Sequence, residues 1–108
     1  MSNQIWLAES PVRMIEGEEI AFSVEWCGAA QVQQPGSRVF RHGVEITETV
    51  MVSGDEDTAS GSLQTLRRIT ALSGDGGNRY VVEVCANVDN NIEKRKLLIQ
   101  IVKPGDEG

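Results

Sequence analysis

The strictest constraint on the fold of this 108-residue chain is an alternation of apolar residues in its last third. Between residues 80 and 88, apolar side chains stand at every second position, directly after a Gly-Asp-Gly-Gly-Asn turn. Successive side chains of a β-strand point to opposite faces, so this spacing predicts a strand with one buried face. With the runs on either side of it, the region 63–103 predicts three consecutive antiparallel strands.

The rest of the chain shows the same period of two, and no segment has the i, i+3, i+4, i+7 spacing of an amphipathic helix. We therefore expect an all-β chain with about seven strands, packed as two sheets. In chain order, the expected strands cover residues 5–7 continued by 12–15, then 18–27, 37–41, 44–52, 63–72, 79–88 and 92–102. Residues 53–61 are polar and acidic and should form the longest exposed loop.

Length and charge limit the domain organisation and the partners. The chain is long enough for one core, so we expect a single domain at residues 1–103 and a flexible C-terminal tail at 104–108. Ten lysines and arginines against sixteen aspartates and glutamates give a net charge of −6, which repels nucleic acids and anionic membranes. We expect protein partners, with self-association among them, and neither nucleic acid nor membrane.

The face of a strand to which a residue points, here called its parity, indicates whether the two cysteines can pair. The alternation places Cys27 on the polar side of the strand at 18–27, and it places Cys85 on the outer side of the strand at 79–88. Outward thiols on opposite sheets lie beyond the roughly 7 Å Cα separation that a disulfide allows. We predict two free thiols, which are typical of a reducing compartment.

One group of residues resembles a known superfold. Ile69, Leu72, Asp75 and Tyr80, followed by alternating valines, resemble the E strand, the turn and the tyrosine-bearing F strand of immunoglobulin-like domains. The resemblance implies an immunoglobulin-like antiparallel β-sandwich. The sequence departs from antibody domains because Val82 stands where the second cysteine would follow the tyrosine. Trp26 also ends the second strand instead of lying in the third.

A narrower resemblance covers most of the chain from Arg38 onward. The segment Arg-Val-Phe-Arg-His-Gly-Val-Glu-Ile-Thr at 38–47, the Ser53-Gly54 loop, residues 80–84 and the alternation through 95–101 resemble small immunoglobulin-like structural proteins of bacteriophages and prophages. Those proteins are head, neck or tail-fibre components. This resemblance implies a non-enzymatic virion component that assembles through its sheet faces and edges.

The N-terminal residues lack the basic segment and apolar core of a secretory signal peptide. No apolar run approaches the roughly 20 residues that span a bilayer. We therefore expect the chain to stay in the cytoplasm where it is made, or to leave it inside a phage particle after lysis.

The sequence offers no catalytic set. The single histidine, His42, precedes Gly43 in a predicted turn, and catalysis by acid and base needs a partner of tuned pKa. We expect no enzyme activity and no cofactor. The densest carboxylate cluster is Asp55, Glu56 and Asp57, which we interpret as a solvated acidic loop. Weak calcium binding is the alternative, because calcium takes oxygen ligands from flexible loops.

Four residues are candidates for contact with a partner. Lys94 and Lys96 share a face of the last strand, and Arg67 shares a face with Ile69, so these charges could form a stripe for an acidic or phosphate-bearing partner. The alternative is that they protect strand edges from aggregation. Trp6 is a candidate anchor because binding hot spots favour tryptophan, although a half-buried tryptophan in an end strand is the more ordinary interpretation.

A second function class remains open at this stage. An adhesin-type domain would bind a carbohydrate or a protein through its end loops, using residues such as Trp6, Asp55 and Asp57.

Overall fold

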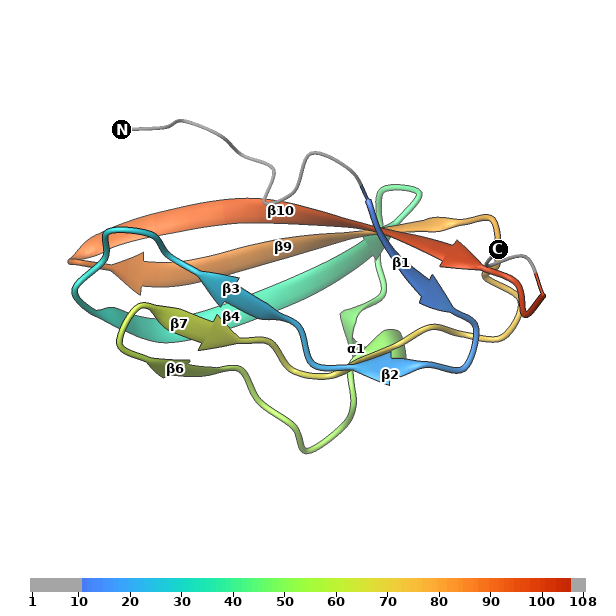
Figure 1. Cartoon of the computed structure of the whole chain (residues 1–108), viewed down its shortest axis with the longest axis horizontal. Coiled ribbons are helices and arrows are strands. Elements are labelled where there is room, and N and C mark those ends of the chain that lie inside the picture. Colours follow the sequence, from blue (N-terminus) through green and yellow to red (C-terminus); the bar gives the residue numbers. More distant parts are fainter. Residues whose placement is uncertain (1–10, 106–108) are drawn as a thin grey trace.

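The computed structural model describes residues 11–105, which form two layers of β-strands around one core (Figure 1). The larger layer is a five-stranded sheet in the order β1-β10-β9-β4-β5. Its strands are β1 (Val12–Ile15), β4 (Val32–Arg41), β5 (Val44–Glu45), β9 (Arg79–Val88) and β10 (Asn91–Val102). The strand expected at 5–7 lies outside the described residues.

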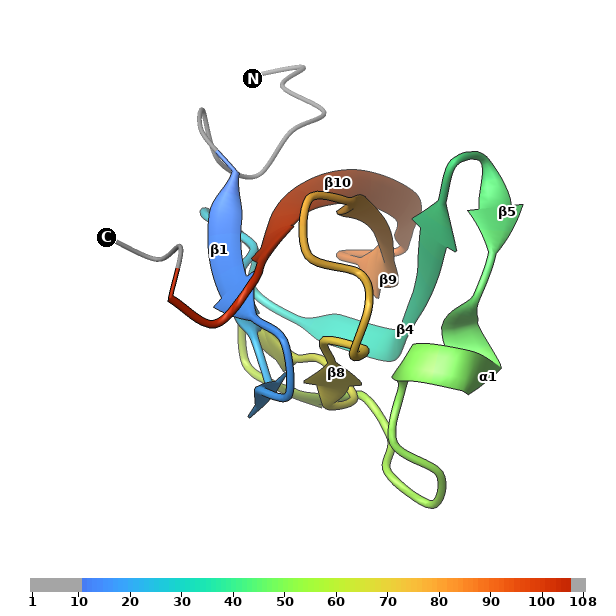
Figure 2. The ribbon, with the colours of Figure 1, turned by 90° about the vertical axis from the view of Figure 1, so that its right-hand side faces the viewer.

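The smaller layer consists of two short sheets. One pairs β2 (Glu19–Ile20) with β8 (Ile69–Thr70), and the other has the order β3 (Ser23–Glu25), β7 (Leu63–Thr65), β6 (Thr58–Ser60). Figure 2 shows the five-stranded sheet curving around the core from β1 over β10 to β4, with β8 across from it. The fold is an immunoglobulin-like β-sandwich, as the tyrosine and turn pattern implied.

The alternation in β9 is the reason that the five-stranded sheet has one buried face. Tyr80, Val82 and Val84 are fully buried, while the residues between them are partly exposed. Val39 of β4 and Ile99 of β10 pair with β9 in register and are fully buried as well. Burial of apolar side chains from strands that are distant in the sequence therefore holds the two layers together.

Both cysteines are free, as parity predicted. Cys27 follows β3 and is exposed, and Cys85 is partly exposed on β9. Val82, two residues after the corner tyrosine, is buried where antibody domains carry a cysteine of the disulfide between their sheets.

Tyr80 closes the turn that leads into β9. Its hydroxyl accepts a hydrogen bond from the backbone N–H of Leu72 (3.1 Å) and donates one to the carboxylate of Asp75 (2.5 Å). This is the tyrosine corner of immunoglobulin-like sandwiches. Arg41 and Asn78 also donate to Asp75, so the carboxylate joins the end of β4 to the turn before β9.

The strand predicted for residues 44–52 is wrong. Within that range β5 covers two residues, α1 (Thr47–Val50) forms one helical turn, and Met51 makes a single antiparallel bridge to Ile69. Ile46 and Val50, four residues apart, are both buried, which a strand with one buried face would also allow. The Thr47 hydroxyl favours the helical turn. It accepts a hydrogen bond from the backbone N–H of Val39 (3.0 Å) and donates one to the carboxylate of Glu45 (2.9 Å).

The strands predicted for residues 18–27 and 63–72 are each interrupted. Between β7 and β8, the backbone N–H of Arg67 donates to the carboxylate of Asp57 (2.8 Å), and that of Arg68 donates to Asp55 (2.9 Å). Two side-chain acceptors thus replace a neighbouring strand, and the ladder stops. Conversely, β4 begins before the predicted residue 37, with an irregular register between Gln33 and Gly36.

Candidate interaction surface

The face of the five-stranded sheet that points away from the core carries three rows of side chains that cross the strands. We call this surface the outer face. The register aligns its rows as Lys96, Glu83 and Arg38, then Leu98, Val81 and Phe40, then Arg13, Gln100 and Arg79. Lys94 of β10 pairs with Cys85 of β9, next to the pair formed by Lys96 and Glu83. The outer face therefore combines charged and apolar groups on one side of a five-stranded sheet.

Glu83 is the centre of the charged row. Arg38 donates two hydrogen bonds to its carboxylate, at 2.5 and 3.2 Å, and the ammonium of Lys94 lies 3.9 Å away. The hydrogen bond from Arg38 holds the pKa of Glu83 below its usual value, with the charges of Lys94 and Lys96 adding to the effect and burial opposing it. Glu83 is therefore ionised at neutral pH and fixes the Arg38 side chain over the sheet.

The apolar row lies beside the charged row. Leu98, Val81 and Phe40 are all partly buried and occupy neighbouring strands. The guanidinium of Arg38 lies 5.4 Å from the centre of the Phe40 ring, which is within the range of a cation–π interaction. An apolar strip bordered by charges is the composition of a protein interface, where apolar residues fill the centre and polar residues form the rim.

A shallow depression adjoins the third row. Arg13, Gln100 and Lys103 line it together with Gly76 and Gly77. The backbone N–H of Gly76 is already bonded to the carboxylate of Glu16 (2.7 Å), and Gln100 accepts a hydrogen bond from Arg79 (2.9 Å). The amide of Gln100 also donates to the backbone carbonyls of Asn78 and Ile101 (3.1 Å each), so the donors of Gly76 and Gln100 are already used within the fold.

The structure separates the basic residues that the sequence grouped. Lys94 and Lys96 lie on the outer face of β10, which agrees with their predicted parity. Arg67 instead lies between β7 and β8 in the smaller layer, and only 16% of its side chain is exposed. Its guanidinium donates to the backbone carbonyl of Val52 (2.8 Å) and pairs with Glu48 (3.0 Å). Arg67 therefore supports the fold and does not extend the lysine stripe.

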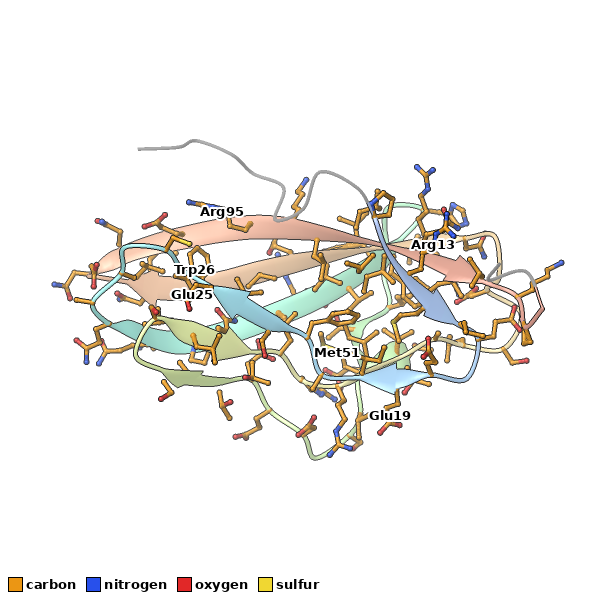
Figure 3. All side chains as sticks on the ribbon, viewed as in Figure 1. Arg13, Glu19, Glu25, Trp26, Met51 and Arg95 are labelled. Atoms are coloured by element: carbon orange, nitrogen blue, oxygen red, sulfur yellow. The ribbon has the colours of Figure 1, made fainter. Side chains whose placement is uncertain are left out.

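Trp6 lies outside the described residues. The tryptophan within them, Trp26, is buried at the end of β3, and its indole N–H donates to the buried side chain of Gln64 (2.9 Å). Figure 3 shows Trp26 between the labelled Glu25 and Arg95, and the Arg95 guanidinium lies 5.3 Å from the indole ring. Trp26 is thus a core residue with a polar partner.

The acidic loop departs from the solvated state that the sequence predicted. Asp57 accepts hydrogen bonds from the hydroxyl of Ser37 (2.8 Å), the amide of Gln64 (3.1 Å) and the backbone of Arg67. The backbone hydrogen bond from Arg68 lowers the pKa of Asp55, against the effect of burial. Of the three acidic residues, Glu56 is exposed, whereas Asp55 and Asp57 are partly buried. Within residues 11–105, no three metal-ligating side chains cluster closely enough to hold an ion.

Sequence reasoning missed Arg38, Glu83 and the three apolar residues of the outer face. Their outward direction could have been derived from the same alternation that placed Cys85. Their neighbours on other strands could not, because one sequence does not specify the register between strands. Register puts Arg38 opposite Glu83 and Phe40 opposite Val81.

The strand order and the tyrosine corner define the class of this protein as an immunoglobulin-like β-sandwich. No family model matches the chain, and no curated protein matches it either. Among solved structures, it is similar to titin domain M4, at 16% identity over 94% of this chain and 92% of that one, with a TM-score of 0.48.

It is also similar to a complex of titin M10 with an obscurin-like 1 immunoglobulin domain, at 16% identity over 87% of each chain and a TM-score of 0.47. A third similar structure is murine CRIg, at 14% identity over 86% of this chain and 91% of that one, with a TM-score of 0.48. Such likeness concerns the fold alone. In the described part of the chain, no helix has the length and apolar character needed to cross a membrane.

Proposed function

We propose that this domain is a non-enzymatic structural and interaction module that binds protein through its outer face. The observation that carries the proposal is the apolar row of Leu98, Val81 and Phe40, bordered by the charged row of Lys96, Glu83 and Arg38. Because the sandwich scaffold hosts many functions, the surface and not the fold supports this choice.

The setting that we propose is a bacteriophage or prophage particle, in which the chain is a head, neck or tail-fibre component made in the cytoplasm. The resemblance from Arg38 onward supports it. Four residues of that resemblance belong to the outer face: Arg38, Phe40, Val81 and Glu83. A structural protein that assembles through a sheet face needs an arrangement of this kind.

The adhesin alternative has weaker support. It relies on the carboxylates of the acidic loop, and those of Asp55 and Asp57 accept hydrogen bonds from the chain's own backbone. Groups already satisfied within the fold offer less to a sugar hydroxyl, because binding would have to break existing hydrogen bonds.

Site-specific photo-crosslinking tests the proposed function, either in the cells that make the protein or in the particles that contain it. A photoreactive phenylalanine derivative replaces Val81 on the outer face, and a matched variant carries it at Gln31, which is exposed before β4. We expect a discrete protein adduct from position 81 and none from position 31. Equal adducts at both positions, or none at position 81, would overturn the proposal. The mass of the adduct identifies the partner as a second copy or another protein.

A further inference from the structure

The charges of this domain are divided between its two layers. The outer face and its border carry five basic side chains against two acidic ones. The basic residues are Arg13, Arg38, Arg79, Lys94 and Lys96, and the acidic residues are Glu45 and Glu83. The whole chain has a net charge of −6, so this face is positive on an acidic protein.

The smaller layer has the opposite balance. We call its outward residues, together with those of α1 and the acidic loop, the acidic side. Its acidic members are Glu19, Glu25, Glu48, Asp55, Glu56 and Asp57, and its basic members are Arg67 and Arg68. The Glu48 side chain is 80% exposed even though it pairs with Arg67. Figure 3 shows Glu19 and Glu25 projecting from β2 and β3.

We propose that the outer face binds the acidic side of a second copy of this chain, an inference that rests on the proposed function. Charge complementarity identifies the occupant, since the same molecule offers a positive face and a negative side on opposite layers. Such complementarity steers two surfaces together and fixes their register. The apolar row at Leu98, Val81 and Phe40 supplies the area that loses water on contact.

The arrangement must be head to tail. Two outer faces placed against each other would bring Lys94, Lys96 and Arg38 of one copy against the same cations of the other, which is costly. When the outer face of one copy binds the acidic side of another, the first copy keeps a free acidic side and the second keeps a free outer face. Such heterologous contacts continue into rings or open arrays instead of stopping at a dimer. Assembly of this type fits a component of a larger particle.

Charge reversal on each surface, followed by mixing, tests this inference. One variant carries Lys94→Glu and Lys96→Glu on the outer face, and the other carries Glu19→Lys and Glu25→Lys on the acidic side. Sedimentation velocity and light scattering over a range of concentrations measure the mass of each. We expect the unaltered chain to grow in mass with concentration. Each variant alone should associate at least about tenfold more weakly, because like charges then oppose each other across the contact.

An equimolar mixture of the two variants is the decisive sample. The intact outer face of one variant can bind the intact acidic side of the other, so we expect association to return on mixing. Gln31→Glu, which adds a negative charge at an exposed position before β4 and away from both surfaces, is the control and should associate like the unaltered chain. Circular dichroism and thermal melting confirm that every variant is folded.

Three results would overturn the inference. They are an unaltered chain that stays monomeric at every concentration, a pair of variants that associate undiminished, and a mixture that stays monomeric although each variant is folded. None of these touches the proposed function, which a cross-link from position 81 to a different protein would still support. Failure of the cross-link, by contrast, would remove both.

Discussion

At the scale of single residues, Tyr80 connects the sequence pattern to the stability of the fold. Its ring is fully buried, and its hydroxyl joins the backbone of Leu72 to the carboxylate of Asp75. Tyr80→Phe keeps the ring but leaves both groups short of a partner, so we expect it to lower the free energy of unfolding by about 2 kcal/mol. Tyr80→Ala should cost more, on the order of 3 kcal/mol or above, because it also leaves a cavity.

Denaturant unfolding of the two variants measures both effects. Val81→Ala, one position along the same strand with its side chain on the outer face, is the control for a general effect of altering β9. A Tyr80→Phe variant as stable as the unaltered chain would show that the corner hydrogen bonds contribute nothing.

Tyr80 also makes the fold sensitive to alkali. Burial, reinforced by the hydrogen bond to Asp75, raises the pKa of Tyr80 to about 12. An unfolded chain ionises its tyrosine near pH 10, or about two pH units lower. A pKa raised on folding contributes stability that is complete below the unfolded value and is lost as pH rises through the folded one.

We therefore expect the melting temperature to fall between about pH 10 and pH 12 as Tyr80 loses its proton. The Tyr80→Phe variant is less stable throughout but should show a smaller fall over this window. Thermal melting of both proteins across the range provides the comparison. Parallel pH profiles for the two proteins would contradict this account of the pKa.

Asp75 gives the corresponding effect in acid. Burial would raise the pKa of its carboxyl group, but hydrogen bonds from Tyr80, Asn78 and Arg41 outweigh burial and hold it below the usual value. A lowered pKa contributes stability above the unfolded value of about 3.9, which is lost as pH falls through the folded value. The tyrosine corner thus weakens at both extremes of pH, for opposite reasons.

At the scale of elements, the acidic loop is a structural connector between the smaller layer and β4. Asp57 accepts from Ser37 of β4, from Gln64 of β7 and from the backbone of Arg67, where the ladder between β7 and β8 stops. Asp57→Ala removes all three hydrogen bonds. We expect this change to lower the free energy of unfolding by about 2 kcal/mol or more.

Glu56→Ala provides a matched control from the same loop, because its side chain is exposed and the same charge is removed. It should change stability by less than about 0.5 kcal/mol. Chemical denaturation of the two variants in parallel makes the comparison. Equal effects would mean that the loop acts through its overall charge and not through the contacts of Asp57.

The elements that could be predicted are those in which local alternation and burial agree. β9 and β10 have that property over most of their length, and so their positions and facing residues follow from the sequence. α1 could not be predicted, since the Thr47 hydroxyl meets the backbone of Val39 only once the hairpin has formed. The interruption between β7 and β8 depends in the same way on Asp55 and Asp57, which are 13 and 10 residues away from their backbone partners.

The candidate surface shows the same limit. Lys94 and Lys96 were found because they stand two positions apart on one strand. Arg38 and Glu83, which lie 45 residues apart in the chain, become neighbours only through the register of β4 with β9. Parity within a strand can be derived from one sequence, whereas the alignment of several strands depends on the packing of the whole core.

At the scale of the whole molecule, the two layers are joined by burial and not by a covalent link. Tyr80, Val82, Val84 and Ile99 are fully buried in one contiguous core. The two thiols take no part in it, since Cys27 is exposed beyond β3 and Cys85 lies on the outer side of β9. Stability should therefore not depend on the redox state of the solution.

The double substitution of Cys27→Ser and Cys85→Ser puts that conclusion to the test. We expect it to change the free energy of unfolding by no more than about 0.5 kcal/mol per site, because neither thiol fills the core. The unaltered chain should unfold at the same denaturant concentration with and without a thiol reductant. Val82→Ala is the contrasting variant, because truncation of a buried aliphatic side chain leaves a cavity and should cost about 1 to 3 kcal/mol. A denaturation midpoint that falls on reduction would indicate a disulfide between Cys27 and Cys85. The strand parity of β3 and β9 forbids that bond, so the register of the sandwich would then have to differ.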